Sequence, residues 1–312
     1  MAALPLALRA QEKKPVVGFV GLTTAAEWAP YVEGFRAGLK DAGFVEGRDV
    51  IVDYEWAEGH YERLPGIVAA FVKRPVDVIV PVAPPATRAA KAATSTIPIV
   101  FFMGSDPVAL KIVTNLSRPE ANITGATALA NFLGPKRLEL LREILPEAGV
   151  YGLLVNPTNQ NAGPDTGELK KAAEASGKKL LIASASKEDD IAAAFVSFAR
   201  EKIGGVIINP DPFLLQQRKQ IAGLARRDQI ATIFHLPEPV AAGGLMSYGA
   251  SFVDAHHTTG LYAGRILKGA KPADLPIPQP TVFELVINAA TAKVIGLELP
   301  STLLARADRV IE

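Results

Sequence analysis

The sequence predicts an α/β protein with two doubly wound parallel-sheet lobes. Short apolar runs rich in Val and Ile alternate with segments whose apolar residues recur at helical spacing. A continuous apolar run is typical of a parallel strand buried on both faces. The alternation occurs twice, over residues 16–102 and again over residues 151–234, and each series requires right-handed crossovers between parallel strands. The turn after a strand also repeats, as Asp106-Pro107 in the first half and Asp211-Pro212 in the second. We therefore expect two similar lobes.

In the first half, four strands alternate with three helices. The helix after the first strand places Trp28, Phe35 and Leu39 at helical spacing and ends at Gly43. The expected strands are residues 16–21, 50–56, 77–82 and 99–102, and the helices span 28–39, 64–71 and 86–93. Residues 122–127 are interpreted as a strand or a connecting segment.

The second half repeats the pattern and adds a late extension. The expected strands are residues 151–155, 180–185, 206–208 and 232–234, and the helices span 138–145, 167–176, 191–198 and 214–224. A strand over 245–249, a helix over 254–267, a Pro-rich linker over 271–280, a strand over 282–288 and a helix over 291–295 follow. This extension is too short to fold alone, so it must return to an existing lobe. We expect residues 14–125 with 251–280 in lobe 1 and residues 126–250 with 281–312 in lobe 2, joined by a multi-strand hinge near residues 126, 250 and 280.

Composition narrows the functional class. The formal net charge is +1 and no Lys/Arg cluster forms a stripe, so the electrostatic footprint of a nucleic-acid binder is missing. The absence of cysteine excludes disulfides, thiolate metal sites and cysteine nucleophiles. Residues 2–10 are apolar, too short to span a bilayer, and similar to the tail of a secretory signal cleaved after Ala10. We expect export without membrane insertion; the alternative is a disordered N-terminus (residues 1–13).

Ligands of doubly wound sheets bind outside the carboxyl ends of the strands, so the turns there are the candidate site. These turns hold small, hydroxylated or amide residues beside helix N-termini, whose free N–H groups favour a carboxylate. Each could also be an ordinary turn or capping residue. The candidate ligand contacts are Thr23, Thr24, Trp28, Ala83, Pro85, Ala86, Thr87, Gly104, Ser105, Asp106, Asn156, Asp211, Phe234, His235 and Tyr248.

Within this set, Asp106 and Asp211 are interpreted first as helix N-caps before proline. A capping Asp can still direct its second oxygen at a ligand ammonium. His235 can donate to a ligand or form a local hydrogen bond, and Trp28 can stack on an aromatic ligand. Metal binding is not expected, because His256 and His257 are adjacent on a helix and their rings diverge.

Catalytic signatures are missing from the sequence. Gly18-Phe19-Val20-Gly21 lies within the first strand and lacks the third glycine of a dinucleotide fingerprint. No P-loop, His-Glu-x-x-His or Gly-x-Ser-x-Gly motif occurs. We expect no cofactor and no enzymatic activity.

Several long stretches resemble the ABC-transporter substrate-binding proteins, the family that includes tryptophan- and aromatic amino acid-binding lipoproteins. The resemblance rests on residues 35–48 (Phe-Arg-Ala-Gly-Leu-Lys-Asp-Ala-Gly-Phe-Val-Glu-Gly-Arg), 54–59, 93–100, 106–109, 243–249, 283–288 and 303–307. It implies a type I periplasmic binding protein fold, in which a ligand is trapped between two lobes as they close. It also implies a carboxylate held by Thr23, Pro85-Ala86-Thr87 and Ser105, with Asn156, Asp211 and His235 as contacts from the second lobe. The loop of residues 83–87 departs from the Gly/Ser/Thr-rich form that the family implies there, and this departure puts α-amino acid specificity in question.

We therefore expect a soluble, monomeric periplasmic protein, since the lipid-anchoring cysteine of a lipoprotein is absent. Its expected role is to deliver a small amino acid or an aromatic or aliphatic carboxylate to an ABC permease. The alternatives are a ligand-sensing module for a receptor or kinase and a Rossmann-like enzyme. A repressor core is disfavoured because no DNA-binding headpiece precedes residue 15.

Overall fold

The structure is a computed structural model that describes residues 13–74, 76–159 and 161–312. The chain forms two compact units. Unit 1 contains the described residues up to Phe101, together with Ser117–Gly125 and His256–Pro276, and unit 2 contains Phe102–Leu116, Ala126–Ala255 and Ile277–Glu312. The expected signal remnant over residues 2–10 lies outside the described residues.

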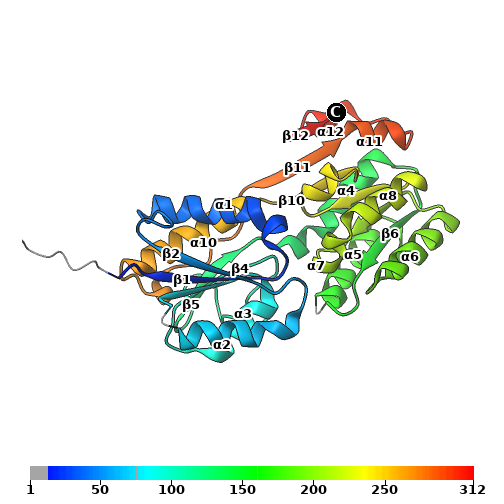
Figure 1. Cartoon of the computed structure of the whole chain (residues 1–312). Coiled ribbons are helices and arrows are strands. Elements are labelled where there is room, and N and C mark those ends of the chain that lie inside the picture. The colour runs from blue at the N-terminus through cyan, green and yellow to red at the C-terminus, as the bar shows by residue number, and fades with distance from the viewer. Residues whose placement is uncertain (1–12, 75, 160) are drawn as a thin grey trace, which may run out of the picture. The chain divides into compact units, whose positions relative to one another are not determined.

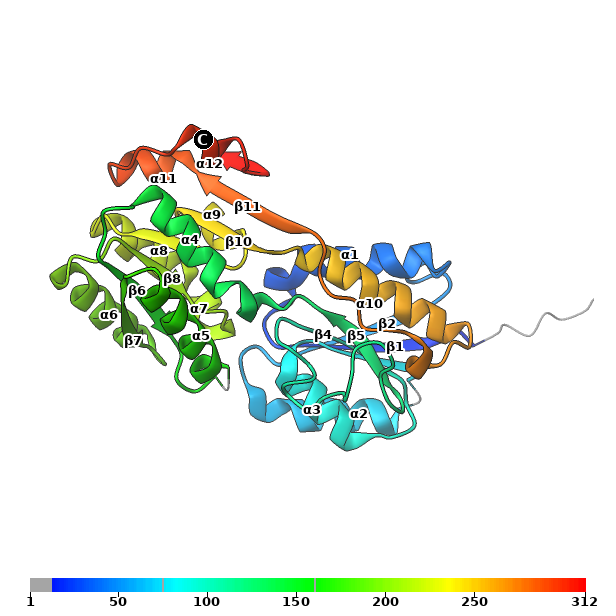
Figure 2. The same cartoon turned by 180° about the vertical axis from the view of Figure 1, so that it is seen from behind.

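A five-stranded sheet forms the centre of unit 1, in the order β2-β1-β3-β4-β5. Its pairs β1–β2, β1–β3 and β3–β4 are parallel. The strands are β1 (Val16–Gly21), β2 (Ile51–Trp56), β3 (Val78–Pro81), β4 (Ile99–Met103) and β5 (Ile123–Thr127). The helices are α1 (Ala25–Asp41), η1 (Tyr61–Arg63), α2 (Leu64–Lys73), α3 (Ala83–Ala93), α10 (Phe252–Leu267) and η3 (Pro272–Asp274). Helices α1 and α10 cover one face of the sheet, and α2 and α3 cover the other (Figures 1 and 2).

Helices α1 and α10 pack with their backbones in contact. A Cβ on Gly38 would lie 1.9 Å from the carbonyl oxygen of His257, and a Cβ on Gly260 would lie 2.0 Å from that of Phe35. Only glycine fits at such a distance, so this pair of positions sets how closely the two helices approach.

Unit 2 is built on a seven-stranded sheet in the order β12-β11-β10-β9-β8-β6-β7. Its strands are β6 (Val150–Val155), β7 (Lys179–Ser184), β8 (Gly205–Ile208), β9 (Ala231–Phe234), β10 (Met246–Ala250), β11 (Phe283–Asn288) and β12 (Arg309–Ile311). Its helices are η2 (Ala130–Leu133), α4 (Gly134–Ile144), α5 (Ala162–Ala175), α6 (Glu188–Arg200), α7 (Pro212–Gln216), α8 (Arg218–Arg227), α9 (Glu238–Ala241), α11 (Ala289–Val294) and α12 (Ser301–Leu304).

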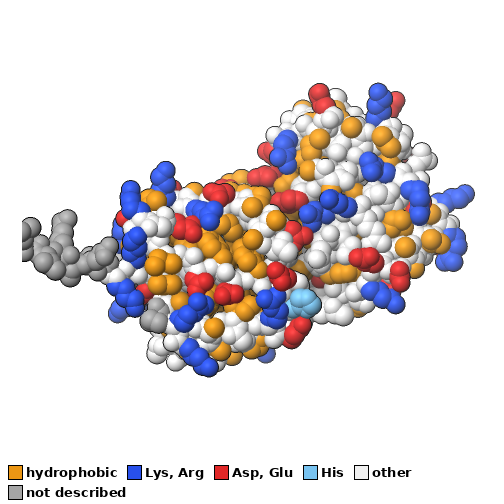
Figure 3. All heavy atoms as spheres, in the orientation of Figure 1, with side chains coloured by type: hydrophobic (Ala, Val, Ile, Leu, Met, Phe, Trp, Pro, Cys, Tyr) orange, Lys and Arg blue, Asp and Glu red, His pale blue; other side chains and the backbone are white. Residues whose placement is uncertain are grey.

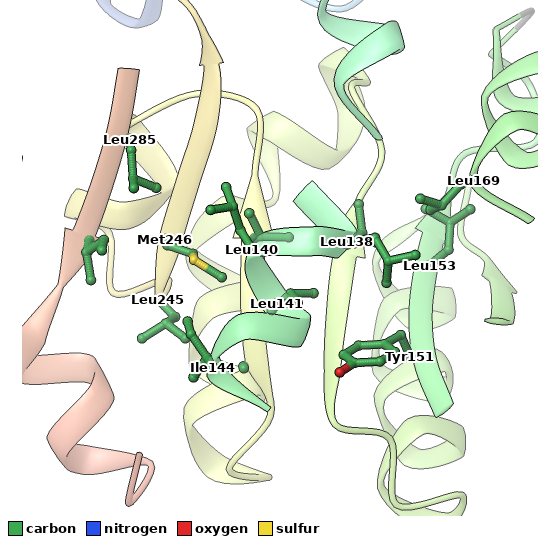
Figure 4. Packing of buried hydrophobic residues seen from close by; sticks show 14 of the residues in the cluster. Leu138, Leu140, Leu141, Ile144, Tyr151, Leu153, Leu169, Leu245, Met246 and Leu285 are labelled. Atoms are coloured by element: carbon green, nitrogen blue, oxygen red, sulfur yellow. The ribbon is translucent and has the colours of Figure 1, made fainter. Parts of the chain in front are cut away.

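Alternate residues of the central strands fill two separate cores, one on each face of this sheet. Leu153 of β6 packs in a cluster with Leu138, Leu141 and Leu169 from α4 and α5 (Figure 4). Its neighbour Leu154 belongs to the other cluster, with side chains from α6 and α8. Because successive strand residues point to opposite faces, a strand that serves both cores must be apolar throughout. This requirement accounts for the continuous apolar runs in the sequence.

One pair in unit 2 departs from the expected parallel arrangement. Strand β11 pairs with β10 antiparallel, whereas β9–β10 and β11–β12 are parallel. The chain leaves unit 2 after Ala255, shortly after β10 ends, and re-enters it at Ile277, shortly before β11 begins. Strand β11 therefore starts where β10 ends and runs back along it.

The expected two-lobed α/β fold is confirmed, and each expected strand is present within one or two residues of its predicted bounds. The helix expected over 214–224 is divided into α7 and α8. The short elements β12, α9 and α12 were missed, because three or four residues carry too little periodicity to be recognised. Residues 102–116, which the sequence placed in lobe 1, group with unit 2. The exact lobe boundaries stay a prediction.

We predict that Gly38→Ala lowers the free energy of unfolding by about 2 kcal/mol or more, because the new Cβ would overlap the backbone of α10. The matched control is Gly66→Ala in α2, where a Cβ would meet no atom within 4 Å. That change should stabilise the protein by about 0.5–1 kcal/mol, because alanine gives the unfolded chain less conformational entropy than glycine does. Urea unfolding of both variants tests the pair, and equal effects would contradict the packing argument.

Candidate functional site

Polar residues gather where the central strands of unit 2 end. Strands β6, β8 and β9 are adjacent and parallel, so Asn156, Asn209 and His235 follow their carboxyl ends at one edge of the sheet. All three side chains are buried. This edge is where a doubly wound sheet binds its ligands.

Asp211, two residues beyond Asn209, is the centre of a hydrogen-bonded cluster. Its side chain caps α7 by accepting from the Leu214 amide at 2.9 Å. The side-chain amide of Asn156 lies 3.3 Å from both carboxylate oxygens, and that of Asn159 donates to Oδ2 at 2.9 Å. Asp211 is 4% exposed, and within the described ranges no basic side chain forms an ion pair with it. The Asp211 carboxylate is thus buried against three N–H donors, and no cation among the described residues pairs with it.

The turn after β4 joins the same cluster through the connection between β6 and α5. Asn161 donates from its side-chain amide to the Ser105 hydroxyl at 2.7 Å. The next residue, Asp106, accepts from the Val108 amide at 2.7 Å and from the Ala109 amide at 3.3 Å. Ser105 is buried and Asp106 is half-buried. Asn159 and Asn161 therefore link Asp211 with the loop that carries Asp106.

His235 is buried beside a positive charge. Its ring lies 6.1 Å from that of Phe252, and its Nδ1 atom has no hydrogen-bond partner among the described residues. Burial, reinforced by the nearby guanidinium of Arg137, lowers the pKa of His235 to about 3. The imidazole is therefore neutral at physiological pH.

Arg137 in α4 is a polar residue of this region that the sequence analysis missed. It is 1% exposed, and it donates from Nε to the Tyr248 carbonyl at 2.9 Å and from Nη2 to the Ala130 carbonyl at 2.6 Å. Burial lowers the pKa of Arg137 to about 10, although the negative charge of Asp165 acts to raise it. The guanidinium therefore stays protonated at neutral pH. One signal was available in the sequence: Arg137 lies four residues before Leu141, on the helix face that packs into the core.

In unit 1, the start of α1 is closed by its own side chains. Thr24 and Glu27 form a reciprocal capping box, with the Glu27 amide donating to the Thr24 hydroxyl at 3.3 Å. Trp28 is 8% exposed and donates its indole N–H to Nε2 of His256 at 3.0 Å. The Thr23 hydroxyl is buried without a hydrogen-bond partner among the described residues.

The start of α3 has an unusual backbone. Ala83 adopts a left-handed conformation with φ of +70°, and Pro84 and Pro85 follow it in the first turn. The fully buried Thr87 donates its hydroxyl to the Ala83 carbonyl at 2.9 Å. Ala86 is also fully buried.

The remaining candidates lie in unit 2. Phe234 is 2% exposed and packs in the core around Phe195. Tyr248 is half-buried, with its ring stacked on Phe283 at 6.2 Å between centroids. A Cβ on Gly104 would meet Ala130 and Phe252 at 3.7 Å, an ordinary contact distance. The structure thus brings Asn156, Asp211 and Ser105 into one cluster, and the assignment of all candidates as ligand contacts stays a prediction.

Other kinds of site find little support in the described residues. No group of three or more His, Asp and Glu side chains there is arranged to hold a metal ion. Across the described ranges, none of the helices combines the length and apolar character needed to cross a membrane. Basic and acidic side chains are interspersed on the face shown in Figure 3.

Comparison with known proteins shows the family to which this chain belongs. Residues 26–311 match the family model described as ABC transporter substrate binding protein. The sequence is 24% identical over 266 residues to the tyrosine-binding protein of Clostridioides difficile, covering 85% of this chain and 76% of that protein. A conserved domain protein from Vibrio cholerae superposes with a TM-score of 0.86 at 30% identity, covering 96% of this chain and 100% of that one. The ABC domain from Streptococcus pneumonia in complex with L-Trp gives a TM-score of 0.85 at 23% identity, with the same coverage.

We predict that His235 makes stability pH-dependent. The His235 side chain is protonated below about pH 6.5 in the unfolded chain and only below about pH 3 in the folded chain. Between these two pH values the unfolded state binds more protons, so the free energy of unfolding falls as the pH falls. His235→Gln should reduce that slope by up to about 1.4 kcal/mol per pH unit.

Urea unfolding at pH 6.5, 5.5 and 4.5 measures the slope. The control is His60→Gln, because the His60 side chain is 62% exposed, and the slope should fall more in His235→Gln than in this variant. An identical slope in wild type and His235→Gln would contradict the prediction.

Proposed function

Because the chain belongs to the ABC transporter substrate-binding protein family, we propose that it captures a small organic ligand carrying an ammonium group and delivers it to an ABC permease. Members of this family are solute-binding proteins rather than enzymes. Relatives are a tyrosine-binding protein and a protein in complex with L-Trp, so amino acids are the first ligands to test. The family match favours transport over the sensing module and the Rossmann-like enzyme.

The observation that carries the ammonium proposal is the buried Asp211 carboxylate. A buried charge is costly unless it is paired or fully hydrogen-bonded. The Leu214 amide and the side chains of Asn156 and Asn159 donate to this carboxylate, but all three donors are neutral and leave its negative charge without a counterion among the described residues. A ligand ammonium would supply the missing positive charge.

His235 provides a second polar contact in this proposal. Its unpartnered Nδ1 is buried, and a neutral imidazole can either donate or accept at this atom. A ligand hydroxyl or ring N–H would satisfy it. The bond would not change with pH across the physiological range, because His235 stays neutral there.

The transport cycle that we propose is a hinge equilibrium. A ligand that binds one arrangement of the two units better than another shifts the population toward it, and only that difference in affinity drives the change. We further propose that the protein acts as a soluble monomer in the periplasm, without nucleic-acid partners.

We predict that Asp211→Asn weakens binding of an ammonium ligand at least about tenfold, because a hydrogen bond to a charged group is lost. The apo stability should change by less than about 1 kcal/mol, since Asn also caps helices well. A thermal-shift screen first identifies the ligand through its stabilisation of the folded state, and calorimetry then compares affinities.

The matched control is Asp190→Asn, which removes the same charge from the half-buried capping residue of α6 in the same unit. Affinity should be unchanged there. Unchanged affinity in Asp211→Asn would remove this residue from the site while leaving the transport function intact.

We also predict that saturating ligand reduces the radius of gyration measured by small-angle scattering. The physical reason is that a closed arrangement is more compact than an open one. A bound ligand with no compaction would contradict the hinge equilibrium.

A further inference from the structure

We infer that Arg137 of unit 2 binds the carboxylate of a zwitterionic α-amino acid whose ammonium group lies at Asp211. This inference rests on the proposed function and adds a ligand-binding residue to the same site. It places the carboxylate on a buried cation of unit 2, whereas the family resemblance implies hydroxyl-bearing turns that include Thr23.

Arg137 is a buried cation without a counterion. It is 1% exposed, and no carboxylate among the described residues forms an ion pair with it. Its Nε and Nη2 atoms donate to the carbonyls of Tyr248 and Ala130, whereas Nη1 donates to no group in the described ranges. The negative charge of Asp165 acts to raise the pKa of Arg137, but that carboxylate accepts from the Asn209 side chain at 3.1 Å. Because a buried charge is costly unless it is paired, Arg137 favours an anion at Nη1.

The guanidinium lies at the carboxyl ends of strands β9 and β10. These strands are parallel, and Ser247 pairs with Phe234. The next residues, Tyr248 and His235, are therefore level with one another. Since Nε of Arg137 donates to the Tyr248 carbonyl, the guanidinium reaches the edge of the sheet that His235 follows. This is the edge at which a doubly wound sheet binds its ligands.

His235 offers a second polar atom beside the guanidinium. Its buried Nδ1 has no hydrogen-bond partner among the described residues, and a neutral imidazole donates from this atom in one of its two tautomers. The two oxygens of a carboxylate can accept from Nη1 of Arg137 and from Nδ1–H of His235. A neutral acceptor would satisfy the same hydrogen bonds but would leave the charge of Arg137 unpaired.

The charge that follows the neighbouring strand has the opposite sign. Asp211 comes after β8, which pairs with β9, and only neutral groups donate to its carboxylate. Adjacent strands lie about 4.8 Å apart, so groups at the ends of β8 and of β9–β10 are separated by roughly 5–10 Å. An α-amino acid carries its two charges on one carbon and adds a hydrogen bond of about 2.9 Å at each end, which suits this separation. A simple amine or a simple carboxylate would neutralise only one of the two buried charges.

Ligand pairs that differ in the charge of the carboxylate test the inference on the full chain. A thermal-shift screen of L-amino acids finds the tightest binder, and calorimetry compares it with its amide, such as L-tyrosine with L-tyrosinamide or L-leucine with L-leucinamide. We expect the amino acid to bind at least about tenfold tighter, because the amide has no negative charge for Arg137. An amide that binds as tightly as its amino acid would overturn the inference.

The same screen separates this inference from the proposed function. If other solutes bind and no amino acid does, the inference is wrong while the solute-binding function stands. No binding across a broad metabolite screen would count against the proposed function itself.

Arg137→Gln tests the residue, and the affinity ratio of amino acid to amide is the readout. This ratio should fall toward one, whereas a purely structural effect would weaken both ligands alike and leave it unchanged. The matched control is Arg142→Gln in the same helix, because Arg142 acts on the pKa of Tyr151 near the amino end of β6 and should not affect the ratio. A ratio that persists in Arg137→Gln but is lost in Thr23→Val would assign the carboxylate to the unpartnered Thr23 hydroxyl and overturn the inference.

A crystal structure of the wild-type protein with the same amino acid decides the question even if Arg137→Gln does not fold. We expect a carboxylate oxygen within about 3.2 Å of Nη1 of Arg137. A carboxylate bound elsewhere would contradict the assignment.

Discussion

The buried carboxylate of Asp211 is the interaction that organises the ligand-binding edge proposed for unit 2. It accepts from the first turn of α7 and from the side chains of Asn156 and Asn159, and so joins the end of β8 to the connection after β6. Desolvating this charge is costly, and the surrounding amides only partly offset the cost. In the proposed site, these donors hold the carboxylate in place without a ligand, which would limit the ordering that binding requires.

A second buried charge acts at the neighbouring strands. Arg137 donates to the carbonyls of Ala130 and Tyr248, which lie in sequence near two of the points where the chain passes between units. Its positive charge and the burial of His235 together keep that imidazole neutral. The edge of the sheet therefore has a negative end at Asp211 and a positive end near Arg137.

The helix starts at the strand ends of this protein are partly satisfied by the chain itself. The capping box at Thr24 and the Asp106 side chain accept from N–H groups of their own turns, whereas the two prolines at the start of α3 lack the N–H groups that other residues would have there. Capping and anion binding compete for the same N–H groups, so a well-capped turn is a poor anion site.

The sequence by itself determined the two-lobed α/β fold and the strand-end turns, because strand burial and Asp-Pro capping are local patterns that need no partner to be recognised. It also pointed to Asn156, Asp211 and His235. Only the tertiary structure decided that Asn156 and Asn159 converge on Asp211, that Trp28 donates to His256, and that Arg137 is buried beside His235. These facts depend on contacts between residues far apart in the chain, and no local periodicity records such contacts. The antiparallel β11 was equally invisible, since its direction follows from where the chain re-enters unit 2.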